Sequence, residues 1–203
     1  MRIGIIGSGH VGSSLAHGLA RHGHDVMLGT RDIDKPVVQQ FVEESDGRGS
    51  AGSYADAARF GDIVITAYPG ALTRESVAML CPENLAGKIV IDAANPIEHL
   101  SDGTTRAAFG DADSAAEVLQ RMAPGARVVK AYNTVGSSRM VDPNPGEGLP
   151  TMRIAGDDAD AKAEVGALLA STGWRVRDLG GLVHARQLEH EAVVWAAGMD
   201  SAR

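Results

Sequence analysis

Hydrophobic residues along this chain follow two alternating patterns. Short, nearly continuous apolar runs, typical of buried strands, occupy residues 2–6, 25–28, 63–66, 89–91, 127–131, 152–155 and 175–177. Runs with apolar residues on one face at helical spacing separate most of them, at residues 11–21, 36–44, 54–59, 72–80, 115–122 and 159–170. This alternation predicts a Rossmann-type α/β fold, in which helices cover both faces of a doubly wound, mostly parallel sheet.

The pattern also predicts how the chain is divided. Residues 1–141 carry most of the alternation and are expected to form one nucleotide-binding domain, followed by a small C-terminal α/β extension over residues 151–203. The segment between them, residues 142–150, is too rich in Pro and Gly for regular structure and forms either a surface connection or a lid. Near the end, Leu188, Ala192, Trp195 and Met199 repeat at helical spacing, as in a helix that faces the core or seals a dimer.

A glycine-rich segment, Gly7-Ser8-Gly9-His10-Val11-Gly12, follows the first strand and opens the first helix. This is the context in which a GxGxxG motif binds a dinucleotide. Gly7 permits the tight turn, Gly9 lets the main chain approach a pyrophosphate, and Gly12 lets the helix pack closely on the strand. The helix N-terminus offers free N–H groups to the anion. His10 faces the pyrophosphate, the nicotinamide or solvent.

The end of the second strand indicates which dinucleotide binds. An NAD site has an acidic residue here that accepts hydrogen bonds from the ribose, whereas this chain has Thr30-Arg31-Asp32, with Lys35 shortly after. Because a guanidinium matches the geometry of a phosphate, Thr30, Arg31 and Lys35 predict a site for the 2′-phosphate of NADP(H). A ribose contact from Asp32 remains the alternative.

Two later strand ends are expected at the same edge of the sheet, where ligands bind in open α/β folds. Tyr68 and Pro69 follow one of them, and Asn95 and Pro96 follow the next. We interpret these residues as walls for the nicotinamide and its ribose, with the Asn95 amide holding the carboxamide of the ring. The alternatives are core packing for Tyr68 and an Asx turn before proline for Asn95.

Candidate chemistry at the following strand end is limited to Lys130, Tyr132 and Asn133, which could form a polar wall near a substrate. Lys130 is either catalytic or points away from the site as the strand alternates. We assign no catalytic residue and no metal ligand, because no Ser/His/Asp grouping or metal-ligand spacing is evident. Hydride transfer between two flat rings needs alignment more than acid–base help, so a flat redox acceptor is favoured over a hydroxy acid.

Composition excludes several classes of partner. The 203 residues carry a formal net charge of −7, which argues against binding to nucleic acid or to an anionic membrane. No apolar stretch approaches the ~20 residues of a membrane span, and the strand at the start leaves no room for a signal peptide. Cys81 is the single cysteine, so no intrachain disulfide forms and we expect a cytoplasmic protein.

Several motifs together resemble the NADPH:coenzyme F420 oxidoreductase family. They are MRIGIIGSGHVG at the start, Gly29-Thr30-Arg31, Ser114-Ala-Ala-Glu117, Val129-Lys-Ala-Tyr-Asn-Thr134, Ala155-Gly-Asp-Asp158, and Asp178-Leu-Gly-Gly-Leu182 followed by Ala185-Arg-Gln-Leu-Glu189. The resemblance runs almost end to end. It implies an NADP(H)-dependent enzyme that transfers hydride to or from the deazaflavin coenzyme F420, and it implies a homodimer.

The resemblance also implies where the ligands bind. NADP(H) is expected on residues 7–12, Thr30, Arg31 and Lys35, with Tyr68 and Pro69 near the nicotinamide. The deazaflavin pocket is expected around two segments of the chain, closed by the C-terminal helix of a dimer. Its residues are Asn133, Thr134, Val135, Gly180, Gly181 and Leu182. Two alternatives stay open: an NADPH-dependent reductase of another acceptor, such as a flavin, quinone or imine, and a non-enzymatic NADP(H)-sensing module.

Overall fold

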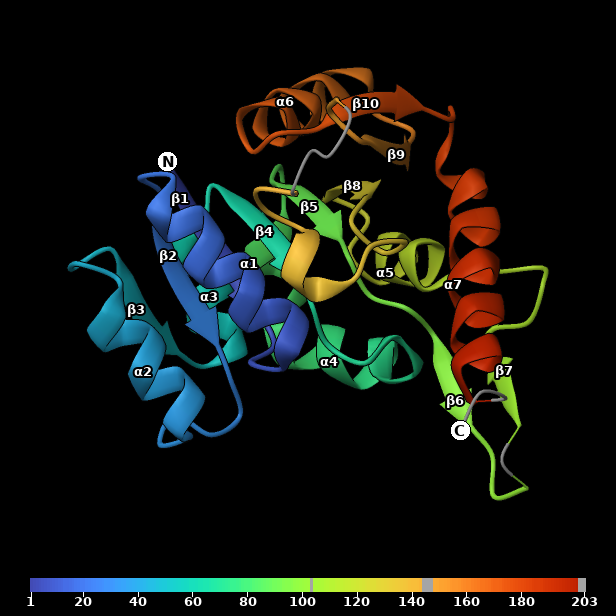
Figure 1. Cartoon of the computed structure of the whole chain (residues 1–203), viewed down its shortest axis with the longest axis horizontal. Helices are drawn as coiled ribbons and strands as arrows, with labels where there is room; N and C mark the ends of the chain where they lie inside the picture. Colours follow the sequence, from blue (N-terminus) through green and yellow to red (C-terminus); the bar gives the residue numbers. More distant parts are fainter. Residues whose placement is uncertain (103, 144–147, 201–203) are drawn as a thin grey trace.

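An eight-stranded sheet forms the centre of the computed structural model (Figure 1). The structure describes residues 1–102, 104–143 and 148–200; residues 199 and 200 are described by their main chain alone. Six neighbouring strands run parallel, in the order β3 (Gly49–Gly52), β2 (Asp25–Gly29), β1 (Arg2–Ile6), β4 (Ile63–Thr66), β5 (Ile89–Asp92) and β8 (Arg127–Lys130). This is the strand order of a Rossmann fold, and it confirms the predicted fold class.

The sheet continues beyond β8 in the opposite direction. β9 (Thr151–Gly156) pairs antiparallel with β8, with Val129 opposite Gly156, and β10 (Arg175–Asp178) pairs parallel with β9. Apolar runs mark strands but carry no sign of their direction, so the reversal could not be predicted.

Of the predicted connection over residues 142–150, residues 144–147 lie outside the described part. At its start, Asp142 accepts a hydrogen bond from His22 at 2.7 Å.

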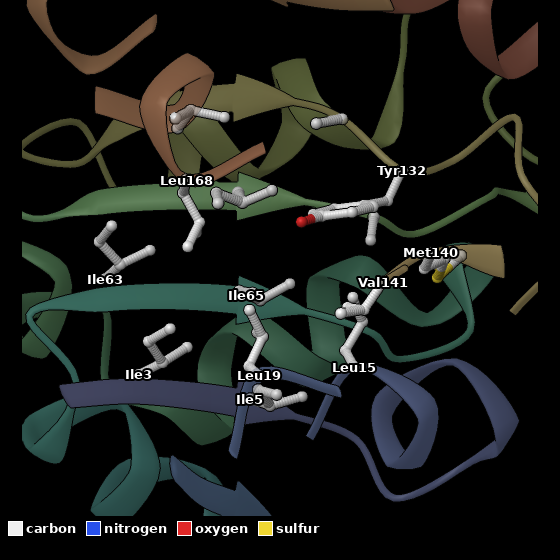
Figure 2. Packing of buried hydrophobic residues seen from close by; sticks show 14 of the residues in the cluster. Ile3, Ile5, Leu15, Leu19, Ile63, Ile65, Tyr132, Met140, Val141 and Leu168 are labelled. Carbon is white, nitrogen blue, oxygen red and sulfur yellow. The ribbon is translucent and has the colours of Figure 1, made fainter. Parts of the chain in front are cut away.

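Two hydrophobic cores lie on the two faces of the sheet. α1 (His10–Arg21), α2 (Pro36–Glu44) and α6 (Ala159–Ser171) pack on one face; α3 (Tyr54–Phe60), α4 (Thr73–Leu80) and α5 (Ala115–Met122) pack on the other. Alternation along each strand separates the cores: Ile63 and Ile65 of β4 belong to the first, and Val64 belongs to the second. Figure 2 shows the first core between the strands and the helix residues Leu15, Leu19 and Leu168.

Short elements without a clear apolar period escaped prediction. β3 reads Gly-Ser-Ala-Gly, and the hairpin of β6 (Ile97–His99) and β7 (Thr105–Ala107) has only three residues in each strand. Four 3₁₀ turns also appear in the described chain: η1 (Gly70–Leu72), η2 (Pro82–Leu85), η3 (Ser137–Arg139) and η4 (Leu182–His184). After η4, α7 (Ala185–Asp200) runs along the side of the molecule and packs against β7 (Figure 1).

Candidate active site

A cleft of about 420 Å³ opens where β1, β2, β4 and β5 end. Most residues predicted to bind the nucleotide line it: Gly7, Ser8, Gly9, His10, Val11, Thr30, Arg31, Lys35, Tyr68, Pro69 and Asn95. Gly12 and Pro96 do not line the cleft. Tyr54, which was not predicted, contributes to the wall beside them. Segments far apart in the sequence therefore meet at the carboxyl edge of the sheet, as the fold class requires.

The glycine loop is shaped by close contacts of the main chain. Gly7 has φ +118°, and a Cβ there would lie 2.6 Å from the carbonyl oxygen of Ala67. A Cβ at Gly12 would lie 1.8 Å from the carbonyl oxygen of Gly7, so any side chain would push the helix off the loop. A Cβ at Gly9 meets no atom within 4 Å in the part of the chain that the structure describes. The loop therefore needs Gly7 and Gly12 for packing, whereas the space beside Gly9 is left open.

The N-terminus of α1 has the features of an anion site. The helix begins after Gly9 with no side-chain cap and with no acidic residue in its first turn. The first N–H groups of any helix lack an intrahelical acceptor, and here no side chain of the cap residue takes that place; the helix dipole also favours a negative group there. Because Gly9 also lines the cleft, a pyrophosphate could approach these N–H groups directly.

Beyond β2, the polar residues divide into structural contacts and unpaired charges. The hydroxyls of Ser8 and Thr30 are 3.0 Å apart, which ties the glycine loop to the end of β2. The Asp32 carboxylate accepts a hydrogen bond from the main-chain N–H of Asp34 at 3.1 Å and does not line the cleft. No ion pair among the described residues engages Arg31 or Lys35. Their positive charges are thus available to a phosphate, and the carboxylate typical of an NAD site is turned into its own loop.

Tyr68 belongs both to the cleft wall and to the second core. It is only 3% exposed, and its hydroxyl has no hydrogen-bond partner within the described residues, although the Thr66 and Thr73 side chains lie near it. Burial, and then the charge of Asp92, raise the pKa of Tyr68 well above the ordinary tyrosine value. The hydroxyl therefore stays neutral, and the ring presents an apolar surface to the cleft.

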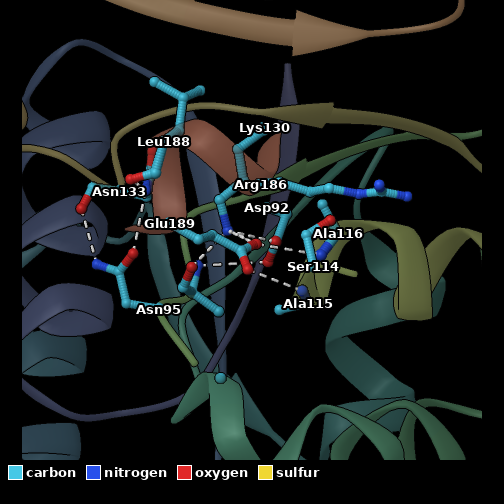
Figure 3. Close-up of polar contacts among 12 residues, drawn as sticks. Asp92, Asn95, Ser114, Ala115, Ala116, Lys130, Asn133, Arg186, Leu188 and Glu189 are labelled. Carbon is cyan, nitrogen blue, oxygen red and sulfur yellow. Dashed lines mark hydrogen bonds and ion pairs between the residues drawn. The ribbon is translucent and has the colours of Figure 1, made fainter. Parts of the chain in front are cut away.

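Asn95 and Asn133 bind each other across the ends of β5 and β8 (Figure 3). The Asn95 amide nitrogen donates to the main-chain oxygen of Asn133 at 2.7 Å, and the Asn133 amide nitrogen donates to the Asn95 side chain at 3.0 Å. The Asn133 amide also donates to the carbonyl oxygen of Leu188 on α7, at 2.9 Å. In this structure the Asn95 side chain is thus engaged in joining two strand ends.

Lys130 is completely buried in an ionic network rather than exposed to a substrate (Figure 3). Its ammonium lies 2.8 Å from Asp92 and 2.7 Å from Glu189 of α7, and it donates to the carbonyl oxygen of Ala94. Burial alone would lower the pKa of Lys130, but the two carboxylates outweigh it and raise the pKa above the ordinary value. Lys130 therefore stays charged and connects α7 to the sheet.

Glu189 extends this network to α5. Its second oxygen accepts a hydrogen bond from the N–H of Ala115 at 2.9 Å, at the N-terminus of that helix. Burial raises the pKa of Glu189, and contact with Lys130 opposes the shift. Sequence reasoning missed both partners of Lys130. Nothing in the pattern indicates that α7, with Glu189, returns to the end of β8, and apolar runs do not give the strand register that places Asp92 opposite Lys130.

A second cavity, of about 480 Å³, adjoins this cleft; Val11, Ala93 and Asn95 line both. Of the residues predicted for the acceptor, Asn133, Thr134 and Val135 line this cavity. The other three, Gly180, Gly181 and Leu182, do not. Leu182 is buried in the second core, and its N–H donates to the Asp157 carboxylate at 2.8 Å, where α7 is about to begin.

Tyr132 was predicted to belong to a polar wall near a substrate, but the structure places it elsewhere. Its side chain lies in the first core, and its hydroxyl has no hydrogen-bond partner among the described residues. Burial raises the pKa of Tyr132 to about 12. Its φ of +64° is unusual for a bulky residue and costs about 1–3 kcal/mol, which the surrounding packing must offset. This turn directs the next residue, Asn133, toward Asn95 and α7.

Comparison with known proteins identifies the family. The family model described as NADP oxidoreductase, coenzyme F420-dependent, matches residues 2–96. The F420-dependent NADP reductase of Methanothermobacter marburgensis is 31% identical, over 93% of this chain and 88% of the reductase. The chain belongs to this family.

A solved structure and a further relative are also similar to this chain. A crystal structure from Arthrobacter sp. FB24, described as that of a candidate F420-dependent NADP reductase, is 34% identical with a TM-score of 0.88 and covers 98% of this chain and 94% of that one. The metalloreductase STEAP3 of Rattus norvegicus is 29% identical over 93% of this chain, which corresponds to 36% of STEAP3. The predicted family and the predicted class, an NADP-dependent oxidoreductase, are confirmed. Within the described residues of this chain, no helix is long and apolar enough to span a membrane.

Proposed function

We propose that this protein transfers hydride between NADPH and the deazaflavin coenzyme F420. The observation that carries the proposal is the shared wall of the cleft and the cavity, made by Val11, Ala93 and Asn95. Two flat rings, one in each space, would meet at this wall. Hydride transfer requires the donor and acceptor carbons to be held about 3–3.5 Å apart, so adjacent ring sites supply its main requirement.

The cleft residues fit NADP(H) by their chemistry. The start of α1, which has no side-chain cap, and the space beside Gly9 suit a pyrophosphate. The charges of Arg31 and Lys35, which form no ion pair within the described chain, suit a 2′-phosphate. Tyr68 and Pro69 would bound the nicotinamide end. The bound cofactor supplies the hydride, and the protein contributes position and the exclusion of water.

The cavity residues fit a flat acceptor. Val11, Val135 and Met140 offer apolar surface, and Asn133 and Thr134 add neutral polar groups. No residue is assigned a proton-transfer role, because Lys130 is held in its buried network. Reduction of a deazaflavin by NADPH takes up one proton with the hydride, and solvent can supply it because the ring spreads the added negative charge. A deazaflavin is therefore favoured over a carbonyl compound, which needs a proton donor placed beside its oxygen.

Assembly and location form part of the same proposal. The exposed side chains of Val194 and Trp195 on α7 (58% and 64% exposed) support a homodimer in which this helix meets a second copy. The single cysteine, Cys81, supports a cytoplasmic location.

The test is NADPH oxidation, followed by the nicotinamide absorbance, with coenzyme F420, free flavin or no acceptor in parallel. We expect turnover with the deazaflavin and little with the others. Thr134→Trp, which places a large ring in the cavity, should abolish this turnover and leave the Kd for NADPH unchanged. Ser138→Trp, at an exposed position off the cavity lining, is the matched control. Equal rates with every acceptor, or none with F420, would reject the deazaflavin assignment and favour another acceptor or a sensor.

A further inference from the structure

Charge is distributed unusually on the wall of the acceptor cavity. Among the described residues that line it, only Arg153 of β9 and Glu191 of α7 are charged. The rest are apolar or carry neutral polar groups, and Trp195 borders the cavity one helical turn beyond Glu191. Whatever charge an acceptor meets on this lining therefore depends on how these two side chains are arranged.

Arg153 and Glu191 form a two-pronged ion pair. One guanidinium nitrogen of Arg153 donates to Oε1 of Glu191 at 2.9 Å, and a second nitrogen donates to Oε2. Gln187, one turn earlier on α7, also donates to Oε1 at 3.1 Å. Hydrogen bonding to Arg153 lowers the pKa of Glu191, so its carboxylate remains ionised at neutral pH.

The pair therefore presents nearly zero net charge to the cavity. A guanidinium in this geometry binds a phosphate or carboxylate in the same way, with two parallel hydrogen bonds. Here Glu191 already occupies that position. An anionic ligand group would have to displace this carboxylate or lie beside it, where like charges repel each other. Both side chains are only partly buried, at 29% and 36% exposure, so a ligand could reach them.

We propose that Glu191 determines acceptor specificity by neutralising Arg153, so that the acceptor contacts this wall with an uncharged part and not with a phosphate or carboxylate. This inference rests on the proposed function, because it assumes a ring-bearing acceptor in the cavity. The nucleotide cleft has the opposite arrangement: no ion pair between described residues engages Arg31 or Lys35, where a phosphate is expected. Unpaired cations favour an anion in the cleft, and a paired cation disfavours one in the cavity.

Riboflavin and FMN provide the test, since they share one ring system and differ by a phosphate. Their Kd values would be measured by flavin fluorescence on the NADP⁺-saturated protein, for the wild type and for Glu191→Gln, Arg153→Gln and the double variant. In Glu191→Gln, the freed guanidinium should tighten FMN binding about tenfold relative to riboflavin, the effect expected of one charge-assisted contact. Arg153→Gln should weaken FMN relative to riboflavin, and the double variant should restore the wild-type ratio.

A matched control separates this effect from the general loss of an ion pair. Asp113 and Arg121 form a similar two-pronged pair off the cavity lining. Asp113→Asn should leave the ratio of FMN to riboflavin affinity unchanged. An unchanged ratio in Glu191→Gln, a wild type that already prefers FMN strongly, or no flavin binding to any variant would overturn the inference.

Failure of this inference can be told apart from failure of the proposed function. If the flavin ratio shifts with Glu191 but F420 is not reduced, the cavity selects by charge and the deazaflavin assignment is wrong. If F420 is reduced and the flavin ratio does not respond to Glu191, only the role of the ion pair is wrong.

Discussion

The cleft at the glycine loop and the cavity beside α7 share part of their walls but hold their charged side chains in opposite ways. In the cleft, Arg31 and Lys35 have no ion-pair partner in the described chain, and α1 begins without a cap. In the cavity, Arg153 is held by Glu191. Under the proposed function, the difference teaches that a site for a fixed phosphate keeps its donors unsatisfied until the ligand arrives, whereas a site for a ring lowers its own charge in advance.

The two regions also differ in how they are held together. The cleft is shaped by close main-chain contacts, of Gly7 with Ala67 and of Gly12 with Gly7, and by the contact between the hydroxyls of Ser8 and Thr30. The cavity wall on α7 is joined to the sheet by long-range polar contacts, chiefly Lys130 with Glu189. If this contrast is correct, a substitution that weakens the attachment of α7 should have little effect on nucleotide binding, and a substitution in the cleft should have little effect on stability.

The largest expected effect is on the buried network. Lys130→Met leaves Asp92 and Glu189 buried without their cation, which should lower the free energy of unfolding by about 3–5 kcal/mol. Urea denaturation measures this. Lys162→Met removes a pair with Asp178, whose side chain is 48% exposed, and should cost about 1 kcal/mol or less. Similar losses in the two variants would show that the network does not carry the attachment of α7.

Gly9→Val is the counterpart in the cleft. A Cβ at this position meets no atom of the described residues within 4 Å, so the free energy of unfolding should stay near that of the wild type. The side chain would instead block the approach of the pyrophosphate, and we expect the Kd for NADPH to rise roughly 100-fold, or about 2.8 kcal/mol. Calorimetric titration measures the Kd. Gly12→Val should show the reverse, a marked loss of stability, because its Cβ would lie 1.8 Å from the Gly7 oxygen.

Arg31→Ala sharpens the assignment of the unpaired charge. Loss of one charge-assisted phosphate contact, about 1.5–3 kcal/mol, should raise the Kd for NADPH roughly 10- to 100-fold. The Kd for NADH should change little, because NADH has no 2′-phosphate. Binding of both nucleotides to the wild type and the variant provides the comparison. Equal weakening of NADPH and NADH would remove the basis for a 2′-phosphate site.

The smallest effect concerns the Arg153–Glu191 pair and pH. Contact with Arg153 holds the pKa of Glu191 below its ordinary value, so the pair stabilises the fold above that ordinary pKa. This stabilisation is lost as pH falls through the lowered pKa of the folded state. Because the pair is partly exposed, Glu191→Gln should cost about 0.2–1 kcal/mol at neutral pH, and the difference should vanish in acid. Thermal unfolding of both proteins across this range measures it; a difference that persists in acid would rule out the ion pair as its cause.

Local patterns were sufficient for most of the parallel sheet. α2 (Pro36–Glu44) and α5 (Ala115–Met122) begin and end where the apolar spacing predicts, and β1 and β4 match their apolar runs. β3 was missed because Gly-Ser-Ala-Gly has no side chain large enough to show a period. Pairing with β2 along four residues compensates for the weak strand propensity of this segment, which lies at the edge of the sheet.

The sequence by itself predicted a nucleotide site from local signals: a glycine loop between a strand and a helix, and Thr30-Arg31 at the next strand end. Most of these residues line one cleft. Only the tertiary structure showed that Lys130 is buried against Asp92 and Glu189, and that Arg153 and Glu191 meet on the cavity wall. The physical reason is separation along the chain. Short-range steric and dipole effects are written in neighbouring residues, whereas the partner of a buried charge is decided by which distant elements pack together.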